Sequence, residues 1–282
     1  MEKKKTLVLI SAAAVLVVAI ALVAIQFVFK TPIYGGPYHR VVVEREEKTL
    51  VDVIKERGYL VVGTSADFPP FEFVAENGTI MGFDIDIAKE IAKKLGVELK
   101  VVDMDFDALI PALQDGKIDL IIAGMSITEE RKKVVDFSEP YFEADQAILV
   151  RADSEIASLD DLKGKKVGVQ SGTTGEDWAV TNLVEAGITS EENLYSYDKF
   201  IAAVEALRIG HLDAVVMDAP VAKTFVKKYP ELKIAFIVKT GEVYGIAVRK
   251  GEAELLDLIN EVLKELKETG KLDKLVEKWF GG

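Results

Sequence analysis

The sequence predicts an α/β protein built from two similar sheet-containing units with mostly parallel strands, preceded by an apolar N-terminal segment. Three observations support this fold class. From Leu50 onward strand-like runs alternate with helix-like runs, a pattern typical of βαβ units and parallel sheets. One stretch of the chain recurs in altered form farther on, and the N-terminal region contains a long uncharged run.

The uncharged run, residues 6–29, follows Lys3, Lys4 and Lys5. A helix of ~24 residues rises ~36 Å, which is enough to cross a bilayer core of ~30 Å. Because a signal-peptide core has only ~7–15 apolar residues, we expect an uncleaved transmembrane anchor rather than a removed signal. The lysines of residues 1–5 should form a cytoplasmic stub, which puts the rest of the chain on the extracytoplasmic side of the cell membrane.

Residues 30–48 are predicted to be a linker, because Pro and Gly residues precede a short charged stretch that has no sustained period. Short runs rich in β-branched and apolar residues then predict strands, and longer runs predict helices. The expected strands are 59–64, 99–103, 118–124 and 146–151, and the expected helices are 83–95, 106–114 and 128–134.

The internal repeat sets residues 113–124, LQDGKIDLIIAG, beside residues 207–218, LRIGHLDAVVMD. Each reads as a helix end, a glycine cap and a buried strand, and a weaker match pairs 58–65 with 164–171. A simpler interpretation is that such connections are common between a helix and a strand. If the two units are real, loops beyond the carboxyl ends of their strands face one shared cleft.

The composition excludes several classes of function. The chain has no cysteine, which excludes disulfides, thiolate metal sites and cysteine nucleophiles. Its net charge of −12 argues against nucleic acid as a partner, because phosphate binding needs a cationic face. Abundant Lys and Glu with few Asn and Gln favour a thermophilic source.

The first candidate binding loop contains Ala123, Gly124, Met125 and Ser126 and leads to Thr128, a predicted helix N-cap. Arg131 lies within the first turn of that helix, where a cation opposes the helix dipole. Its planar guanidinium matches a carboxylate in a bidentate manner, and free N–H groups near Ser126 add donors. The simpler interpretation is a solvated arginine paired with a surface acid.

Two further loops carry complementary groups. Ser171-Gly172-Thr173-Thr174-Gly175 opens a helix and offers an anion-accepting N-terminus, but no Gly-Lys-Ser/Thr follows, which excludes a Walker-type nucleotide site. Asp218 ends an otherwise apolar strand, where an isolated carboxylate needs a cation or several donors. The ammonium group of a ligand supplies both.

Aromatic residues complete the candidate site. Phe68 and Phe106 follow predicted strands in loops, so we expect them at a ligand. Four other phenylalanines are expected in the core instead: Phe71, Phe73, Phe83 and Phe137.

Several ordered motifs extend from about Gly58 to the C-terminus. They include VGTSADFPPFEF at 62–73, GFDID at 82–86, IPALQ at 110–114, AGMSITEER at 123–131, DFSEPY at 136–141, SGTT at 171–174 and KWF at 278–280. Together these motifs resemble the polar amino-acid binding proteins of ABC importers, the bacterial extracellular solute-binding proteins of family 3. The resemblance implies a two-lobed periplasmic-binding-protein type II fold with a hinge that the chain crosses twice.

By this resemblance, lobe 1 comprises 49–140 plus 245–282, lobe 2 comprises 146–239, and the hinge comprises 141–145 and 240–244. Arg131 would hold the ligand carboxylate with backbone donors at Ser126 and Thr174, and Asp218 would hold the ammonium. Phe68 and Phe106 would flank the ligand side chain. The ligand then favours closure, since it contacts both lobes only in the closed state.

The ligand is expected to be arginine or another basic amino acid, with glutamine or another polar amino acid as the alternative. The SADFPP run with Gln170 before the glycine turn looks most like arginine binders. A guanidinium stacked between Phe68 and Phe106 could donate to Ser65, Asp67 or Gln170.

Two other classes of function are the alternatives, an enzyme and a sensor. A dehydratase-like enzyme acting on arogenate-like compounds is possible on this fold, but His39 and His211 are the only histidines, and we expect both to face solvent. A sensor is disfavoured because the chain ends in WFGG without an output domain. We therefore expect no catalytic residue, cofactor or metal, and we expect ABC permease subunits and the membrane as partners.

Overall fold

The computed structural model describes residues 48–281. The predicted stub, the predicted anchor at 6–29, His39 and nearly all of the predicted linker lie outside these described residues. Within 48–281 no helix is both long enough and apolar enough to cross a membrane.

The described chain alternates helices (α, and η for short 3-10 or π turns) with strands (β). In chain order these are α2 (Leu50–Arg57), β1 (Tyr59–Thr64), β2 (Asp67–Phe68), β3 (Glu72–Val74), β4 (Ile80–Met81), α3 (Phe83–Leu95), β5 (Glu98–Asp103), η1 (Phe106–Ala108), α4 (Leu109–Gln114), β6 (Leu120–Ile121), α5 (Glu129–Lys132), β7 (Val135–Phe137), β8 (Phe142–Arg151), η2 (Asp160–Leu162), β9 (Val167–Gln170), α6 (Thr174–Ala179), η3 (Val180–Val184), η4 (Glu191–Asn193), β10 (Leu194–Tyr197), α7 (Phe200–Arg208), β11 (Ala214–Asp218), α8 (Ala219–Lys228), β12 (Leu232–Tyr244), β13 (Ala247–Arg249), α9 (Ala253–Glu268) and α10 (Lys271–Phe280).

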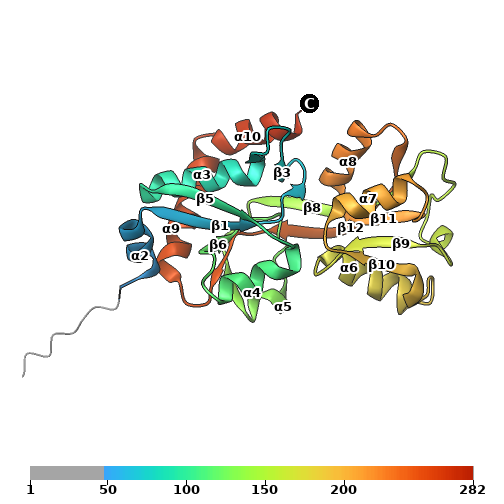
Figure 1. Cartoon of the computed structure of the whole chain (residues 1–282), viewed down its shortest axis with the longest axis horizontal. Coiled ribbons are helices and arrows are strands. Elements are labelled where there is room, and N and C mark those ends of the chain that lie inside the picture. The colour runs from blue at the N-terminus through green and yellow to red at the C-terminus, as the bar shows by residue number, and fades with distance from the viewer. Residues whose placement is uncertain (1–47, 282) are drawn as a thin grey trace, which may run out of the picture. The chain divides into compact units, whose positions relative to one another are not determined.

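Two five-stranded sheets form the centres of two lobes (Figure 1). The first lobe contains the sheet β5-β1-β6-β13-β7, and the second lobe contains the sheet β10-β9-β11-β8-β12. Both lobes bury apolar side chains on both faces of their sheet. In β1, for example, Leu60 and Val62 pack on the side of α2 and α3, whereas Val61 packs on the side of α4. Helices on both faces of each sheet explain why the inner strands β1, β6, β9 and β11 are buried along nearly all of their length.

The sheets are mixed, so the expectation of mostly parallel strands is only partly right. In the first lobe β1 pairs in parallel with β5 and β6, but β13 joins β6 and β7 by antiparallel pairing. In the second lobe β9 pairs in parallel with β10 and β11, but β8 and β12 add antiparallel pairs. The antiparallel strands are those on which the chain passes between the lobes or returns to the first sheet.

The internal repeat corresponds to equivalent positions in the two sheets. β1 and β9, which carry the weaker match, each lie second in their sheet order, and β6 and β11, which carry the stronger match, each lie third. The helices before β6 and β11 are α4 and α7, as the repeat predicted. The simpler interpretation, in which the repeat is only a common helix-to-strand connection, therefore fails.

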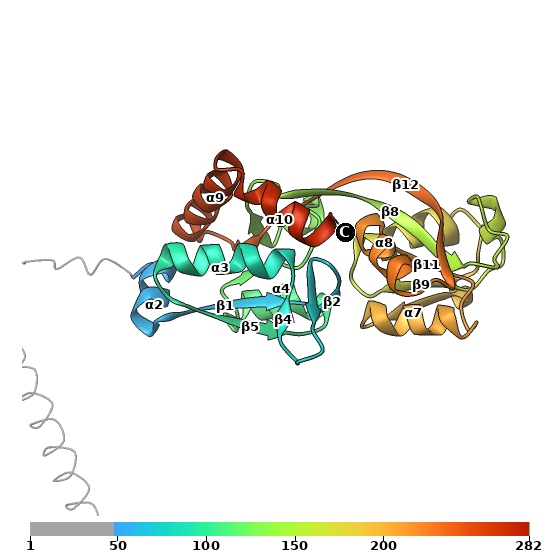
Figure 2. The same cartoon turned by 90° about the horizontal axis from the view of Figure 1, so that it is seen from above.

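The two lobes are linked by β8 and β12, which lie side by side in Figure 2. Near the first lobe, residues 142–144 of β8 pair antiparallel with residues 242–244 of β12. The register shifts between Val238 and Glu242, which marks a bulge in β12. The segments predicted as hinge therefore lie next to each other, although the limits of the lobes stay a prediction.

A small sheet, β2-β3-β4, is held against the first lobe by aromatic packing. The ring of Phe71 lies 5.0 Å from that of Phe280 and 4.8 Å from that of Phe142, measured between centroids. Phe71 and Phe83 are fully buried, as expected for core residues. This packing fixes the loop that carries Phe68.

Candidate functional site

A pocket lies between the lobes, beyond the carboxyl ends of the parallel strands. It encloses about 310 Å³ that protein atoms do not fill, counted with adjoining solvent. The residues that line it are Ser65, Phe68, Glu72, Phe106, Ala123, Gly124, Ser126, Arg131, Gln170, Thr173, Thr174, Phe200 and Asp218.

Arg131 places a guanidinium at one end of the pocket. Its short helix α5 begins after Thr128, whose hydroxyl accepts a hydrogen bond from Arg131 N, so the predicted N-cap is present. Nη1 donates to Ser126 O at 2.7 Å, and Nη2 donates to Gly172 O at 3.0 Å in the second lobe. Burial lowers the pKa of Arg131, whereas Asp177, Glu242 and Asp218 raise it. The guanidinium stays charged, because arginine keeps its proton in proteins.

Asp218 places a carboxyl group on the second-lobe side of the pocket. It ends β11 and is 6% exposed, and Oδ1 accepts hydrogen bonds from Tyr244 Oη at 2.6 Å and from Gln146 Nε2 at 3.3 Å. Burial, followed by the charge of Glu242, raises the pKa of Asp218 to about 7. A cation bound beside Asp218 would favour its ionised form.

Glu242 lies behind the pocket and touches both lobes. Its Oε2 accepts hydrogen bonds from Ser126 Oγ of the first lobe at 2.6 Å and from Thr174 Oγ1 of the second lobe at 2.5 Å. Its Oε1 accepts from Gln146 Nε2 at 3.1 Å. These bonds tie the first pocket loop to the glycine-rich turn of the second lobe.

Aromatic rings form the apolar walls. The ring of Phe68 stacks on that of Phe200, with 5.6 Å between centroids, and Phe106 lies under the guanidinium of Arg131 at 5.3 Å. Gly124 is required beside Phe68: its φ is +53°, and an added Cβ would lie 2.5 Å from Phe68 Cε1. The loop 123–126 can therefore pass close to the ring only with glycine at this position.

Ser65 and Gln170 supply neutral polar groups, and both are 2% exposed. Gln170 Nε2 donates to Asp198 O at 3.0 Å, which leaves its side-chain oxygen as an acceptor. Thr173 caps α6 by accepting from Glu176 N and donates its hydroxyl to Gln170 O. The glycine-rich turn thus opens a helix as predicted.

Glu72 is a second buried acid in the pocket lining. It is fully buried, and neither carboxyl oxygen meets a donor within the described chain. Burial first, and the nearby charge of Asp84 next, raise its pKa well above the ordinary value. Asp84 Oδ2 is held by Gly124 N and Tyr141 Oη, but Oδ1 meets no donor. A proton kept on Glu72 is the group that can bond to this oxygen.

The structure brings together all of the predicted site residues except two. Asp67 faces away from the pocket and accepts from Ile201 N at 3.3 Å, and Met125 is 1% exposed within the apolar cluster around α4. Alternation along the chain explains Met125, because Gly124 and Ser126 on either side of it line the pocket. It does not explain Asp67, which is two residues from Ser65 and is held by Ile201 instead. The ligand-binding roles of the assembled residues stay a prediction.

Sequence reasoning missed Glu72 and Phe200. Phe200 follows the end of β10, the signal that was used for Phe106 after β5, so it could have been found. Glu72 stands between two aromatic residues assigned to the core, and an acid within an apolar run is itself a signal. Among residues 48–281 no group of three or more His, Asp or Glu side chains is arranged to hold a metal ion.

Comparisons with known proteins find a matching family and similar chains. Residues 60–282 match the model of the bacterial extracellular solute-binding proteins, family 3. The chain is 40% identical over 227 residues to the arginine-binding extracellular protein ArtP of Bacillus subtilis, covering 79% of this chain and 86% of that protein.

Solved structures are also similar. The holo form of ArgBP from T. maritima is 56% identical with a TM-score of 0.73, covering 81% of this chain and 99% of that one. An ancestral arginine-binding protein bound to glutamine is 55% identical with a TM-score of 0.75, covering 80% and 99%.

Proposed function

This chain belongs to the bacterial extracellular solute-binding proteins, family 3, and we propose that it binds a free amino acid between its lobes and delivers it to an ABC importer. Arginine or another basic amino acid is the proposed ligand. We place the hinge at 141–145 and 240–244, between a first lobe of 49–140 plus 245–282 and a second lobe of 146–239.

One observation carries the proposal: Arg131 of the first lobe and Asp218 of the second lobe line the same pocket. A guanidinium and a carboxylate on opposite sides of a small cavity match the two charged ends of one zwitterion. A ligand held in this way contacts both lobes only when they are closed, so its binding free energy favours closure.

The charges around the pocket favour a ligand with an additional positive charge. Arg131 is the one cationic side chain in the described lining, whereas Asp218 lines the pocket and Glu242 lies directly behind it. Phe68, Phe106 and Phe200 offer faces on which a guanidinium can stack. ArtP and ArgBP, which are named for arginine, support the same choice.

Glutamine is the second candidate. Ser65 and Gln170 can bind a neutral amide, and the ancestral protein that is bound to glutamine is 55% identical to this chain. The named relatives are binding proteins, and a binding function needs no catalytic group. Turnover of a cyclic amino acid by the purified protein would support the dehydratase-like alternative instead.

Calorimetric titration with each of the twenty amino acids tests the ligand. We expect heat from arginine, with weaker or no heat from glutamine. Tight glutamine binding without an arginine signal would refute the choice of arginine, and no binding of any amino acid would refute the proposed function.

Replacement of Arg131 or Asp218 by alanine tests the site. A ligand at a hundred times its Kd stabilises a folded protein by about 2.7 kcal/mol. We expect this thermal shift to vanish in either variant while the ligand-free protein stays folded. Arg208→Ala is the matched control, because Arg208 pairs with Glu205 and Glu231 away from the pocket. An unchanged shift in the Arg131 or Asp218 variant would remove that residue from the site.

We propose that residues 6–29 anchor this extracytoplasmic protein in the cell membrane. The uncharged run behind three lysines supports this proposal. Fractionation of cells that produce the full chain should recover it in carbonate-washed membranes with Lys3–Lys5 intact. Recovery of a soluble product that lacks these residues would show a cleaved signal instead.

A further inference from the structure

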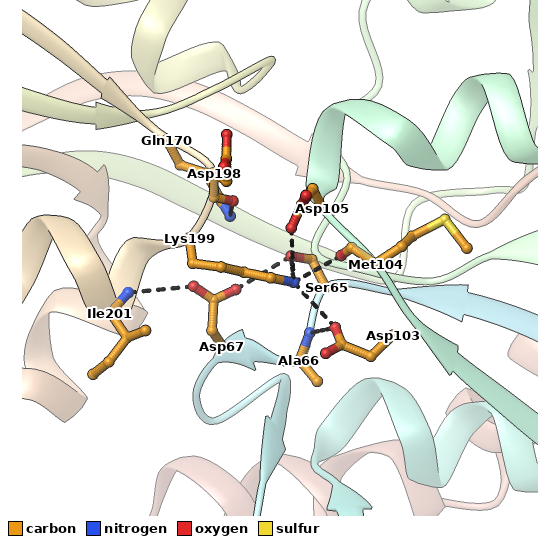
Figure 3. Close-up of polar contacts among 10 residues, drawn as sticks. All are labelled: Ser65, Ala66, Asp67, Asp103, Met104, Asp105, Gln170, Asp198, Lys199 and Ile201. Atoms are coloured by element: carbon orange, nitrogen blue, oxygen red, sulfur yellow. Dashed lines mark hydrogen bonds and ion pairs between the residues drawn. The ribbon is translucent and has the colours of Figure 1, made fainter.

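Lys199 reaches from the second lobe into the first, as Figure 3 shows. It lies between β10 and α7, and its ammonium donates to Met104 O at 2.8 Å, to Asp103 Oδ1 at 3.1 Å and to Ser65 Oγ at 3.2 Å. Asp105 Oδ1 is 3.7 Å away. We call these contacts the Lys199 clasp. Every acceptor belongs to the first lobe.

The acceptors meet because β1 and β5 are parallel neighbours. Ser65 follows β1, and Asp103 ends β5, so both lie at the same edge of the sheet. Asp103 Oδ1 also accepts a hydrogen bond from Ala66 N at 2.8 Å, and this bond within the first lobe holds the carboxylate in position for the lysine. An ammonium has three N–H donors, and the clasp offers an acceptor for each of them.

The clasp connects to groups that line the pocket. Ser65, which lines it, accepts from Lys199 and donates to Asp67 Oδ1 at 3.2 Å, and Asp67 Oδ2 accepts from Ile201 N in the second lobe (Figure 3). On the other side, Gln170 donates to Asp198 O, one residue before the lysine. Hydrogen bonds at Gln170 and at Ser65, joined by the backbone from Asp198 to Lys199, therefore connect polar residues of the pocket across the two lobes.

We propose that Lys199 is a positioning residue that fastens the two lobes and orients Ser65 toward the ligand. All of its donors and acceptors belong to this chain, so the clasp stabilises the closed arrangement without needing a ligand atom. Its effect on ligand release rests on the proposed function, whereas its effect on lobe closure does not.

Distance measurements between the lobes of the ligand-free full chain test the clasp directly. Because the chain has no cysteine, Lys55→Cys and Glu192→Cys introduce one label at an exposed position in each lobe. We expect Lys199→Met to shift the distance distribution toward longer separations and Lys199→Arg to restore much of the original distribution. Lys250→Met is the matched control, because Lys250 pairs with Asp136 inside the first lobe. Identical distributions for the original chain and Lys199→Met would overturn the proposal.

Dissociation of arginine, followed by stopped-flow fluorescence, tests the effect on the site. Because Lys199 and Asp103 are partly exposed, their ion pair should contribute about 1 kcal/mol to closure. We therefore expect arginine to dissociate about fivefold faster from Lys199→Met, the factor that corresponds to this free energy. In the Asp103→Asn background, Lys199→Met should have a smaller effect. A rate that Lys199→Met leaves unchanged would refute the positioning role. If no amino acid binds the original chain, the proposed function fails, and the distance measurement still decides whether the clasp exists.

Discussion

At the scale of single residues, Glu72 shows how burial decides the state of a polar group in this protein. A carboxylate with no donor within reach is costly to bury, and here the raised pKa reflects that cost. The neutral acid can instead donate to Asp84, whose other oxygen binds Gly124 of the pocket loop. A proton on Glu72 that bonds to Asp84 would thus help to hold the loop 123–126.

We predict that Glu72→Gln changes the free energy of unfolding by less than about 1 kcal/mol at pH 5, because glutamine has the shape and donors of the neutral acid. A group whose pKa is raised by folding loses its stabilising contribution as pH rises, so the original chain should weaken from about pH 5 upward. The variant should melt increasingly above the original chain as pH rises to 9. Scanning calorimetry at several pH values measures this difference. A constant difference across the range would show that Glu72 does not titrate with folding.

The sequence was sufficient to predict the site residues that lie at or after the end of a predicted strand. Arg131, Asp218 and Gln170 each follow or end a strand of the predicted units, and they do line one pocket. It was insufficient for Asp67 and Met125, because the direction of a side chain in a short irregular segment depends on partners far away in sequence. Asp67 turns toward Ile201, more than a hundred residues later.

At the scale of elements, the loop before α6 approaches the start of η1 in the other lobe very closely. Gly172 has φ +73°, and a Cβ there would lie 2.9 Å from Asp107 Cβ and 3.2 Å from Asp107 Cα. Ser171 Oγ donates to Asp107 Oδ2 at 3.2 Å beside it. The closed arrangement therefore requires glycine, which has no side chain, at position 172.

We predict that Gly172→Ala weakens arginine affinity by about tenfold, which corresponds to about 1.4 kcal/mol, because the added methyl group keeps the lobes apart. Gly187→Ala is the control: Gly187 has a similar φ of +70°, but an added Cβ there meets nothing within 4 Å. Both variants should lose a similar amount of folding stability, about 1 kcal/mol, from the left-handed conformation. Calorimetric titration compares the affinities, and equal affinities in the two variants would contradict a role in closure.

Elements with a clear hydrophobic period were predicted well. The strand at 59–64 and the helix at 83–95 have the expected bounds. The predicted strand at 118–124 is shorter, Leu120–Ile121, because the chain leaves the ladder to form the pocket loop. The predicted strand at 146–151 is longer, beginning at Phe142, because its first residues pair with the end of β12. Pairing between segments that are distant in the sequence therefore determines where such strands begin and end.

At the scale of the whole molecule, the pKa of Asp218 links ligand binding to pH. The carboxyl group titrates at about 7 in the described structure, and the ammonium of a bound amino acid would stabilise the ionised form. Binding should therefore release a proton below pH 7, so that affinity falls as pH falls.

We predict that arginine affinity decreases about tenfold between pH 8 and pH 6, since one pKa unit corresponds to about 1.4 kcal/mol. Titration calorimetry in two buffers of different ionisation enthalpy counts the released protons. We expect close to one proton at pH 6 and close to none at pH 8.5. An affinity independent of pH over this range, with no proton release, would contradict the assignment of the ammonium to Asp218.

The antiparallel pairing of β8 with β12 restricts the relative motion of the lobes. Two hydrogen-bonded strands side by side resist torsion more than a single connecting strand would, so the permitted displacement approximates rotation about one axis. The bulge between Val238 and Glu242 interrupts this ladder and is where the rotation should concentrate. We then expect the far rim of the cleft, where Lys199 meets Asp103, to travel farther than groups near this axis such as Glu242.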